Sequence, residues 1–173
     1  MRRTMMALAA ALAMPLAAAG AVPGVEAYFD AMAITVAPGQ QAQFVSGDNL
    51  AGYFAGRTQS LGKGEGYVTR QGTLFIDYAS FVDGNANERS RSAEQVLPYG
   101  HRVRYPNGAV EEMALLSKRH ALAMSVASPR AAILAIAPLL KDTRSVRQEG
   151  DVVIVEGAGQ FAAFAADQPI VLD

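Results

Sequence analysis

The sequence contains no cysteine and no tryptophan, and it has only two histidines among its 173 residues. Without cysteine the fold cannot use disulfides, and a thiolate zinc site is excluded. The spacing of the two histidines, His101 and His120, matches no zinc-ligand pair on a helix or a strand. No run of basic residues stands beside aromatic residues, so the electrostatic footprint of a nucleic-acid-binding protein is missing. We therefore expect no nucleic acid as a partner.

The first 21 residues have the pattern of a secretory signal peptide. Arg2 and Arg3 supply a positive start, residues 5–16 form an apolar run, and residues 19–21 are a small-x-small cleavage site. A membrane-spanning helix is the alternative, but this run contains Pro15 and is shorter than the roughly 20 apolar residues that a span needs. We expect residues 1–21 to be a cleaved helical signal peptide and the mature protein to be periplasmic or secreted, with no membrane contact after cleavage.

The mature sequence is large enough to fold without cross-links. Removing Arg2 and Arg3 leaves 13 basic and 16 acidic residues, a net charge of about −3 with neutral histidine. A chain of about 150 residues buries roughly 70% of the surface that it exposes when unfolded, which is enough for one hydrophobic core. We expect residues 22–173 to form a single domain.

Short apolar segments separated by turn residues predict strands. Residues 73–81 form an aromatic and β-branched run that suits a half-buried strand. Asn107-Gly108 predicts a tight hairpin turn between strands at residues 101–105 and 109–116, because both positions would supply positive φ angles. Alternation then places His101 and Val103 on one face, with Arg102 and Arg104 on the other.

Later segments extend the same pattern. A second hairpin is predicted between residues 145–148 and 152–155, and residues 131–137 are apolar on both faces, which favours a central strand. A helix is the competing interpretation for residues 117–140, but Pro129 and Pro138 interrupt it. Roughly ten short strands without a long amphipathic helix predict an all-β fold, an antiparallel sandwich in preference to a barrel.

One loop resembles a calcium-binding loop in part. Positions 1, 3, 5 and 12 of such a loop would supply oxygen ligands, and here they are Asp83, Asn85, Asn87 and Glu94. Position 6 is Glu88 instead of the glycine that permits the sharp turn, and Arg89 and Arg91 add positive charge. A solvated loop between strands explains the same residues. We therefore predict no metal and no cofactor, and we retain the four residues as a weak calcium candidate.

No constellation of catalytic residues can be assigned from the sequence. The carboxylates considered for acid–base chemistry are Asp77, Glu94, Glu111 and Glu112. Asp77 lies in an apolar strand, where alternation favours an outward side chain. Glu111 and Glu112 are adjacent in a strand, so they point to opposite faces and cannot act together on one substrate. The aromatic residues considered for stacking on sugars are Tyr53, Phe54, Tyr67, Tyr99 and Tyr105. Aromatic residues in short strands are expected in the core, and the ligand-binding residues stay unknown.

Four ordered blocks resemble the N-terminal β-sandwich domain of secreted bacterial glycosidases of the glycogen-debranching or trehalase-like type. The blocks are residues 46–53, 74–78, 96–102 and 105–112. The resemblance covers most of residues 22–173. In that family the sandwich precedes an (α/α)₆ helical barrel, and the catalytic carboxylates lie in the barrel. This sequence ends at Asp173, before any barrel could begin, so no catalytic residue can be carried over.

Two function classes follow from these observations. The resemblance implies a non-catalytic sandwich of an exported glycoside hydrolase for α-glucan or trehalose-type substrates, with a helical-barrel catalytic domain as its partner. The alternative is a free-standing periplasmic module that binds carbohydrate or envelope components. An exposed apolar patch where a barrel would dock is expected only in the first class. Enzyme activity of this chain alone, with Asp77 taking part, is a third and minor hypothesis.

Overall fold

A computed structural model describes residues 8–10, 25–59, 66–70, 72–138, 140 and 142–172. These residues form sixteen strands, the short helix α1 (Val25–Ala31) and the 3-10 turn η1 (Arg89–Arg91). The predicted all-β antiparallel fold is confirmed, with more strands than expected because several have only two or three residues. The predicted signal peptide lies outside the described residues, except for β1 (Leu8–Ala10), which pairs with two other strands.

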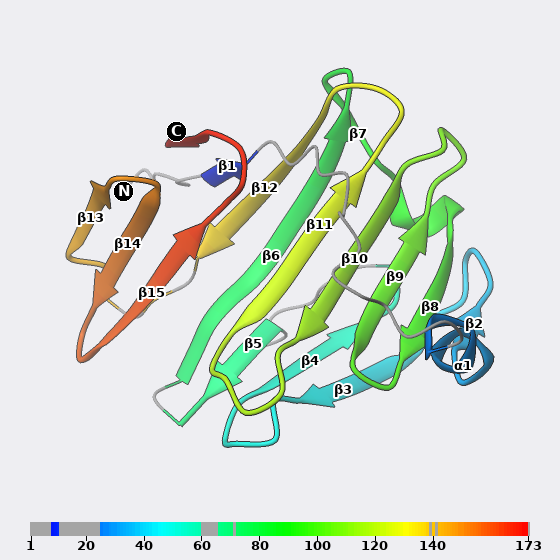
Figure 1. Cartoon of the computed structure of the whole chain (residues 1–173), viewed down its shortest axis with the longest axis horizontal. Coiled ribbons are helices and arrows are strands. Elements are labelled where there is room, and N and C mark those ends of the chain that lie inside the picture. Colours follow the sequence, from blue (N-terminus) through cyan, green and yellow to red (C-terminus); the bar gives the residue numbers. More distant parts are fainter. Residues whose placement is uncertain are drawn as a thin grey trace.

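The strands form three sheets (Figure 1). The eight-stranded sheet has the order β16 (Ile170–Leu172), β1, β12 (Ala132–Pro138), β6 (Gly72–Val82), β5 (Gly66–Thr69), β4 (Tyr53–Arg57), β3 (Gln43–Gly47), with β7 (Asn85–Ala86) paired to β6. The five-stranded sheet has the order β11 (Leu122–Ala127), β10 (Val110–Leu115), β9 (Gly100–Arg104), β8 (Ala93–Leu97), β2 (Ile34–Val36). The three-stranded sheet contains β13 (Ser145–Glu149), β14 (Val152–Gly157) and β15 (Gln160–Ala165).

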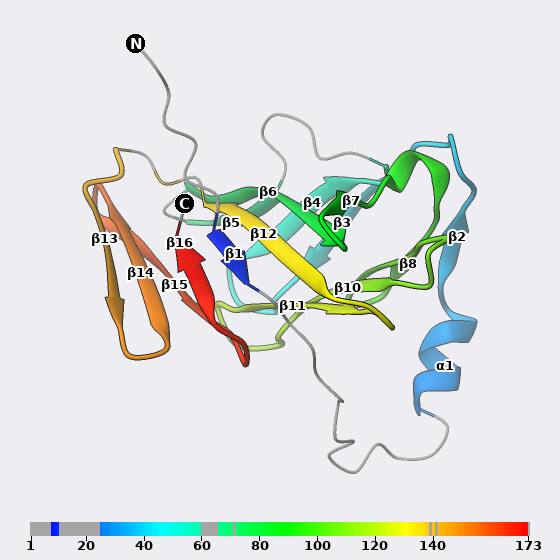
Figure 2. The same cartoon turned by 90° about the horizontal axis from the view of Figure 1, so that it is seen from above.

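The main core lies between the eight-stranded and five-stranded sheets, which form two layers in Figure 2. Its buried side chains are Phe44, Phe54, Tyr67, Tyr78 and Leu134 from the first sheet, and Met113, Leu115 and Val126 from the second. The alternation predicted for β9 is confirmed, because His101 and Val103 are buried whereas Arg102 and Arg104 are not. The three-stranded sheet has its own small core around Val153 and Val155.

The hairpin predicted at Asn107-Gly108 forms, but its turn is different. Only Gly108 has a positive φ, 86°. Its N–H donates to the carbonyl of Tyr105 at 3.0 Å, and the Asn107 side chain accepts the N–H of Ala109 at 3.0 Å. This is a three-residue loop, a type I turn followed by a left-handed glycine, instead of the predicted two-residue turn. The loop is longer because Pro106 occupies the first corner of the turn, where its fixed negative φ fits.

Residues 117–140 form two strands where a helix was the competing interpretation. Pro129 lies in the turn between β11 and β12, and Pro138 ends β12 where the pairing with β6 shifts register. The hairpin predicted near residue 150 is also confirmed, as the pair β13 and β14. Gly100 starts β9 where a side chain cannot fit, because a Cβ atom there would lie 1.9 Å from the carbonyl oxygen of Met113.

Candidate functional site

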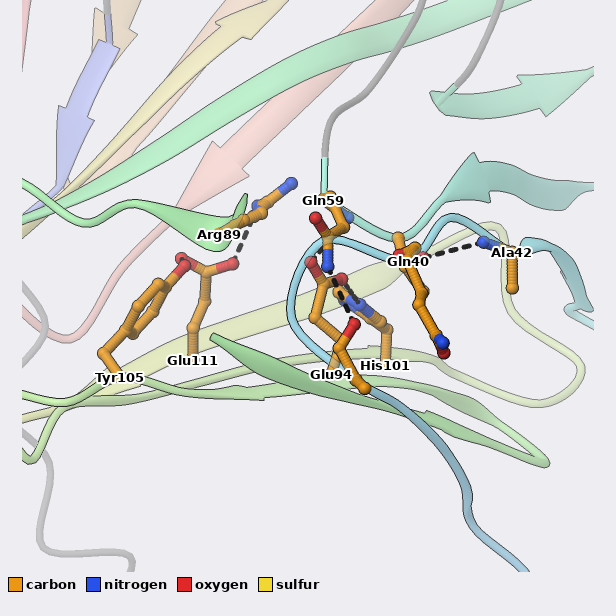
Figure 3. A network of polar contacts seen from close by, with 10 residues as sticks. Gln40, Ala42, Gln59, Arg89, Glu94, His101, Tyr105 and Glu111 are labelled. Atoms are coloured by element: carbon orange, nitrogen blue, oxygen red, sulfur yellow. Dashed lines mark hydrogen bonds and ion pairs between the residues drawn. The ribbon is translucent and has the colours of Figure 1, made fainter. Parts of the chain in front are cut away.

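Two buried carboxylates lie on the inner face of the five-stranded sheet (Figure 3). Glu94 in β8 and Glu111 in β10 both pair in register with Val103 of β9, and they are 0% and 2% exposed. Residues directly opposite one another in a ladder share a face, and neighbouring strands are about 4.8 Å apart, so the two backbones are about 10 Å apart. The structure thus brings together two of the four carboxylates considered in the sequence.

Glu94 is held by a histidine and by a backbone amide. Its Oε2 lies 2.6 Å from Nε2 of His101, and its Oε1 accepts the N–H of Gln59. The His101 ring stacks on Phe44 with centroids 5.0 Å apart. The Gln59 side chain in turn donates to the carbonyl of Ala37 at 3.1 Å. Glu94 therefore fastens the segment after β4, and through it the segment after β2, to the five-stranded sheet.

Glu111 is the acceptor for three side chains. Arg89 donates to it at 2.7 Å, the Ser80 hydroxyl at 2.6 Å and the Tyr105 hydroxyl at 3.0 Å. The Arg89 guanidinium also lies 4.0 Å above the ring centroid of Tyr78. Burial and the charge of Glu111 raise the pKa of Tyr105, so this hydroxyl stays a neutral donor. The result is a buried charge pair in which two hydroxyl groups also donate to the carboxylate.

The four weak calcium candidates have separate partners. Asp83 pairs with Arg130 at 3.0 Å, and Asn85 donates to the Asp83 carbonyl at 3.1 Å. Asn87 donates to the Ser80 hydroxyl at 2.9 Å, whereas Glu94 faces His101 inside the sandwich. Within the described ranges, no group of three or more His, Asp or Glu side chains could hold a metal ion.

The other two carboxylates lie elsewhere. Glu112 is on the outer face of the five-stranded sheet, where it pairs with Arg102. Arg102 also pairs with Asp30 of α1 at 2.6 Å. The predicted opposite orientation of Glu111 and Glu112 is therefore confirmed. Asp77 pairs with Ala137 of β12 through the backbone, and its side chain lies outside the described part of the structure.

A third buried carboxylate, Asp48, was not singled out in the sequence. It is 0% exposed and accepts the N–H groups of Leu50 at 2.8 Å and Gly52 at 3.0 Å. It also accepts the Tyr67 hydroxyl at 3.0 Å and Nδ1 of His120 at 3.1 Å. Burial opposes ionisation, but these four hydrogen bonds outweigh it and lower the pKa of Asp48. Because a carboxylate only accepts, His120 must donate from Nδ1.

The outer face of the eight-stranded sheet carries two apolar areas. On one side Val45 and Tyr53 are 70% and 42% exposed, next to Ala55 and Val68 in register. On the other side Ile133 is 41% exposed and lies opposite Phe81, and Val171 is 60% exposed in β16. Among the aromatic residues considered for sugar stacking, Phe54, Tyr67 and Tyr105 belong to the cores, as predicted, and Tyr53 is exposed.

Comparisons with protein-family models, with curated proteins and with solved structures find no match for this chain. Across the part of the chain that the structure describes, no helix has the length and apolar character to cross a membrane.

Proposed function

We propose that this chain is a non-catalytic β-sandwich that docks onto the (α/α)₆-barrel catalytic domain of an exported glycoside hydrolase and supports it. The substrates of that hydrolase are α-glucans or trehalose-type sugars. The observation that supports this proposal is the outer face of the eight-stranded sheet, where Val45 and Tyr53 are exposed in one apolar area and Ile133 in the other. Single exposed apolar residues are normal, whereas neighbouring exposed apolar residues that form a contiguous area are typical of a protein–protein contact.

The buried carboxylates agree with a non-catalytic role. An acid–base pair needs contact with its substrate, yet Glu94 and Glu111 are 0% and 2% exposed. Each is also paired, with His101 at 2.6 Å and with Arg89 at 2.7 Å. A buried carboxylate whose two oxygens both accept hydrogen bonds from internal donors stabilises the fold and lies out of reach of a substrate proton.

A second candidate function is a carbohydrate-binding module. Tyr53 supports it, because this ring is 42% exposed on the outer sheet face and could stack on the apolar face of a sugar. In this case the chain binds glycans without a catalytic partner.

The two candidates differ in what the purified chain binds. The test is co-expression with an (α/α)₆-barrel glycosidase domain encoded in the same genome, followed by affinity purification. We expect a stable complex that is lost in the double variant Val45→Lys/Ile133→Lys. Phe161→Lys is the matched control, since Phe161 is 66% exposed on the three-stranded sheet and its substitution should leave the complex intact.

A glycan-binding screen of the chain alone separates the second candidate. Specific binding to an α-glucan that is abolished by Tyr53→Ala, with no complex in the co-expression, would establish the binding module and reject the barrel support. Loss of the complex in Phe161→Lys as well would show that the apolar outer face is not the contact.

A further inference from the structure

Two turns from different sheets are tied together at one corner of the molecule. Residues 48–52 connect β3 to β4, and residues 116–120 follow β10; Figure 1 shows the two turns side by side at the lower edge. The Lys118 N–H donates to the Asp48 carbonyl at 2.7 Å, and Asn49 Nδ2 donates to the Ser117 hydroxyl at 3.0 Å. His120 adds the contact with the Asp48 carboxylate at 3.1 Å. We call these two segments the cationic corner.

The backbone of the cationic corner has a fixed shape. Asn49 and Lys118 have positive φ angles of 60° and 58°, a left-handed conformation that asparagine tolerates and that is uncommon for lysine. Gly52 is enclosed, since a Cβ atom there would lie 2.5 Å from Oδ2 of Asp48. A surface that is organised before binding loses little conformational entropy when it meets a partner.

The exposed side chains of the cationic corner include two cations and two leucines. Lys118, Arg119 and His120 are exposed, and no hydrogen bond or ion pair joins the Lys118 or Arg119 side chain to any residue that the structure describes. Leu50 and Leu116 are 55% and 40% exposed on the two turns. The acidic residue of the corner, Asp48, is buried beneath them. A positive tip therefore stands on a chain with a formal net charge of −1.

We propose that the cationic corner docks on a membrane surface that contains anionic phospholipids. Exposed leucines gain free energy by entering the boundary between headgroups and acyl chains, and adjacent Lys and Arg side chains pair with lipid phosphates. Leu50 and Leu116 favour a lipid surface as the ligand, because a soluble phosphate ion would offer these side chains no apolar environment. This membrane contact is peripheral and needs no spanning segment. It differs from the expectation, drawn from the sequence, that the mature chain does not contact membranes. It does not depend on the proposed function.

The absence of tryptophan permits a local test in the full chain. Leu116→Trp introduces a single tryptophan at the cationic corner, and its emission can be excited apart from that of the tyrosines. We expect a blue shift of its emission with phosphatidylcholine vesicles that contain phosphatidylglycerol, a much smaller shift with pure phosphatidylcholine, and a decrease in the shift with added salt. Adding Lys118→Gln and Arg119→Gln should weaken binding to the anionic vesicles roughly 30-fold, which is about fivefold per charge. Phe161→Trp, on the three-stranded sheet, is the control and should not shift.

The local fluorophore also separates the corner from other membrane-binding parts of the chain. The apolar run at residues 5–16 could bind vesicles by itself, but the emission of the Leu116→Trp variant would then stay unshifted while the chain sediments with the vesicles. That result overturns the proposal, and so does an equal shift with neutral vesicles. A shift that millimolar inorganic phosphate abolishes would identify a soluble anion as the ligand and also overturn it. Unchanged thermal melting of the charge variants shows that they are folded.

Discussion

Asp48 shows how a single residue can hold a charge inside a small protein. Its carboxylate is fully buried, yet two backbone amides, a tyrosine hydroxyl and an imidazole donate to it. Hydrogen bonds to the charged form favour ionisation, which is why the pKa of Asp48 is lowered in spite of burial. The pKa of Tyr67 shifts in the opposite direction to that of Asp48, because burial and the neighbouring Asp48 raise it.

The lowered pKa of Asp48 predicts a loss of stability in acid. A carboxyl group that binds its proton less tightly when folded stabilises the fold above its ordinary pKa of 3.8, and this contribution is lost as the pH falls through the lower folded value. Asp48→Asn should cost about 1–3 kcal/mol at pH 7, because a donor replaces an acceptor. Urea unfolding from pH 6 to about pH 3 should give a shallower loss in Asp48→Asn than in the unsubstituted chain.

The exposed residue Asp151 supplies the control for this measurement. Asp151→Asn should leave both the stability at pH 7 and the acid slope nearly unchanged. If Asp48→Asn retained the full acid slope, the stabilisation assigned to this carboxylate would be incorrect.

At the scale of the element, η1 is tied to the sandwich through one side chain. Arg89 is 10% exposed and pairs with Glu111, whereas its neighbour Arg91 is 78% exposed and pairs with Glu88 at 3.0 Å. Arg89→Met should destabilise the protein by about 3–5 kcal/mol, because it leaves the Glu111 charge buried without its cation. The double variant Arg89→Met/Glu111→Gln should cost clearly less than the sum of the single variants in urea unfolding.

Arg91→Met is the matched substitution in the same turn. Because its ion pair is exposed, it should change the unfolding free energy by less than about 1 kcal/mol. Additive effects of Arg89→Met and Glu111→Gln would show that the two side chains are not coupled.

Elements with a local signal could be predicted from the sequence. The run at residues 73–81 became part of β6, and the hairpins at Gly108 and Gly150 formed where turn residues stood between alternating segments. Short elements such as α1 and β7 were missed, since seven or two residues carry little periodicity. The type of turn at Gly108 was predicted wrongly, because it depends on whether Asn107 takes a positive φ together with Gly108.

The candidate sites depend on information that a single sequence does not hold. Alternation correctly separated Glu111 from Glu112, since that needs only the period of one strand. The placement of Glu94 and Glu111 on one face, both opposite Val103, requires the register of β8 and β10 against β9. The contact between Asp48 and His120 spans 72 residues and two sheets. The adjacency of Lys118, Arg119 and His120 was visible in the sequence, but its exposure at an anchored corner was not.

At the scale of the whole molecule, the sandwich and the three-stranded sheet have distinct core clusters, and Ile170 of β16 packs against the second one. Val103 is fully buried in the sandwich, beside Val82 and Tyr105, whereas Val153 is fully buried in the three-stranded sheet, beside Val155 and Leu140. Within the described residues, β13, β14 and β15 form ladders only with one another. A unit with few buried side chains opens at a lower free energy than a large core.

Hydrogen exchange should therefore resolve two levels of protection. We expect the amides of β13–β15 to exchange faster than those of β9 and β10 in the intact chain. Val153→Ala, which removes buried methyl groups, should accelerate exchange in the three-stranded sheet and leave β9 and β10 unchanged, whereas Val103→Ala should accelerate exchange in the sandwich. Mass spectrometry of peptides from both regions measures this difference. If Val153→Ala accelerated exchange in β9 and β10 equally, the two cores would unfold as one cooperative unit, because a local cavity would then lower the free energy of opening everywhere.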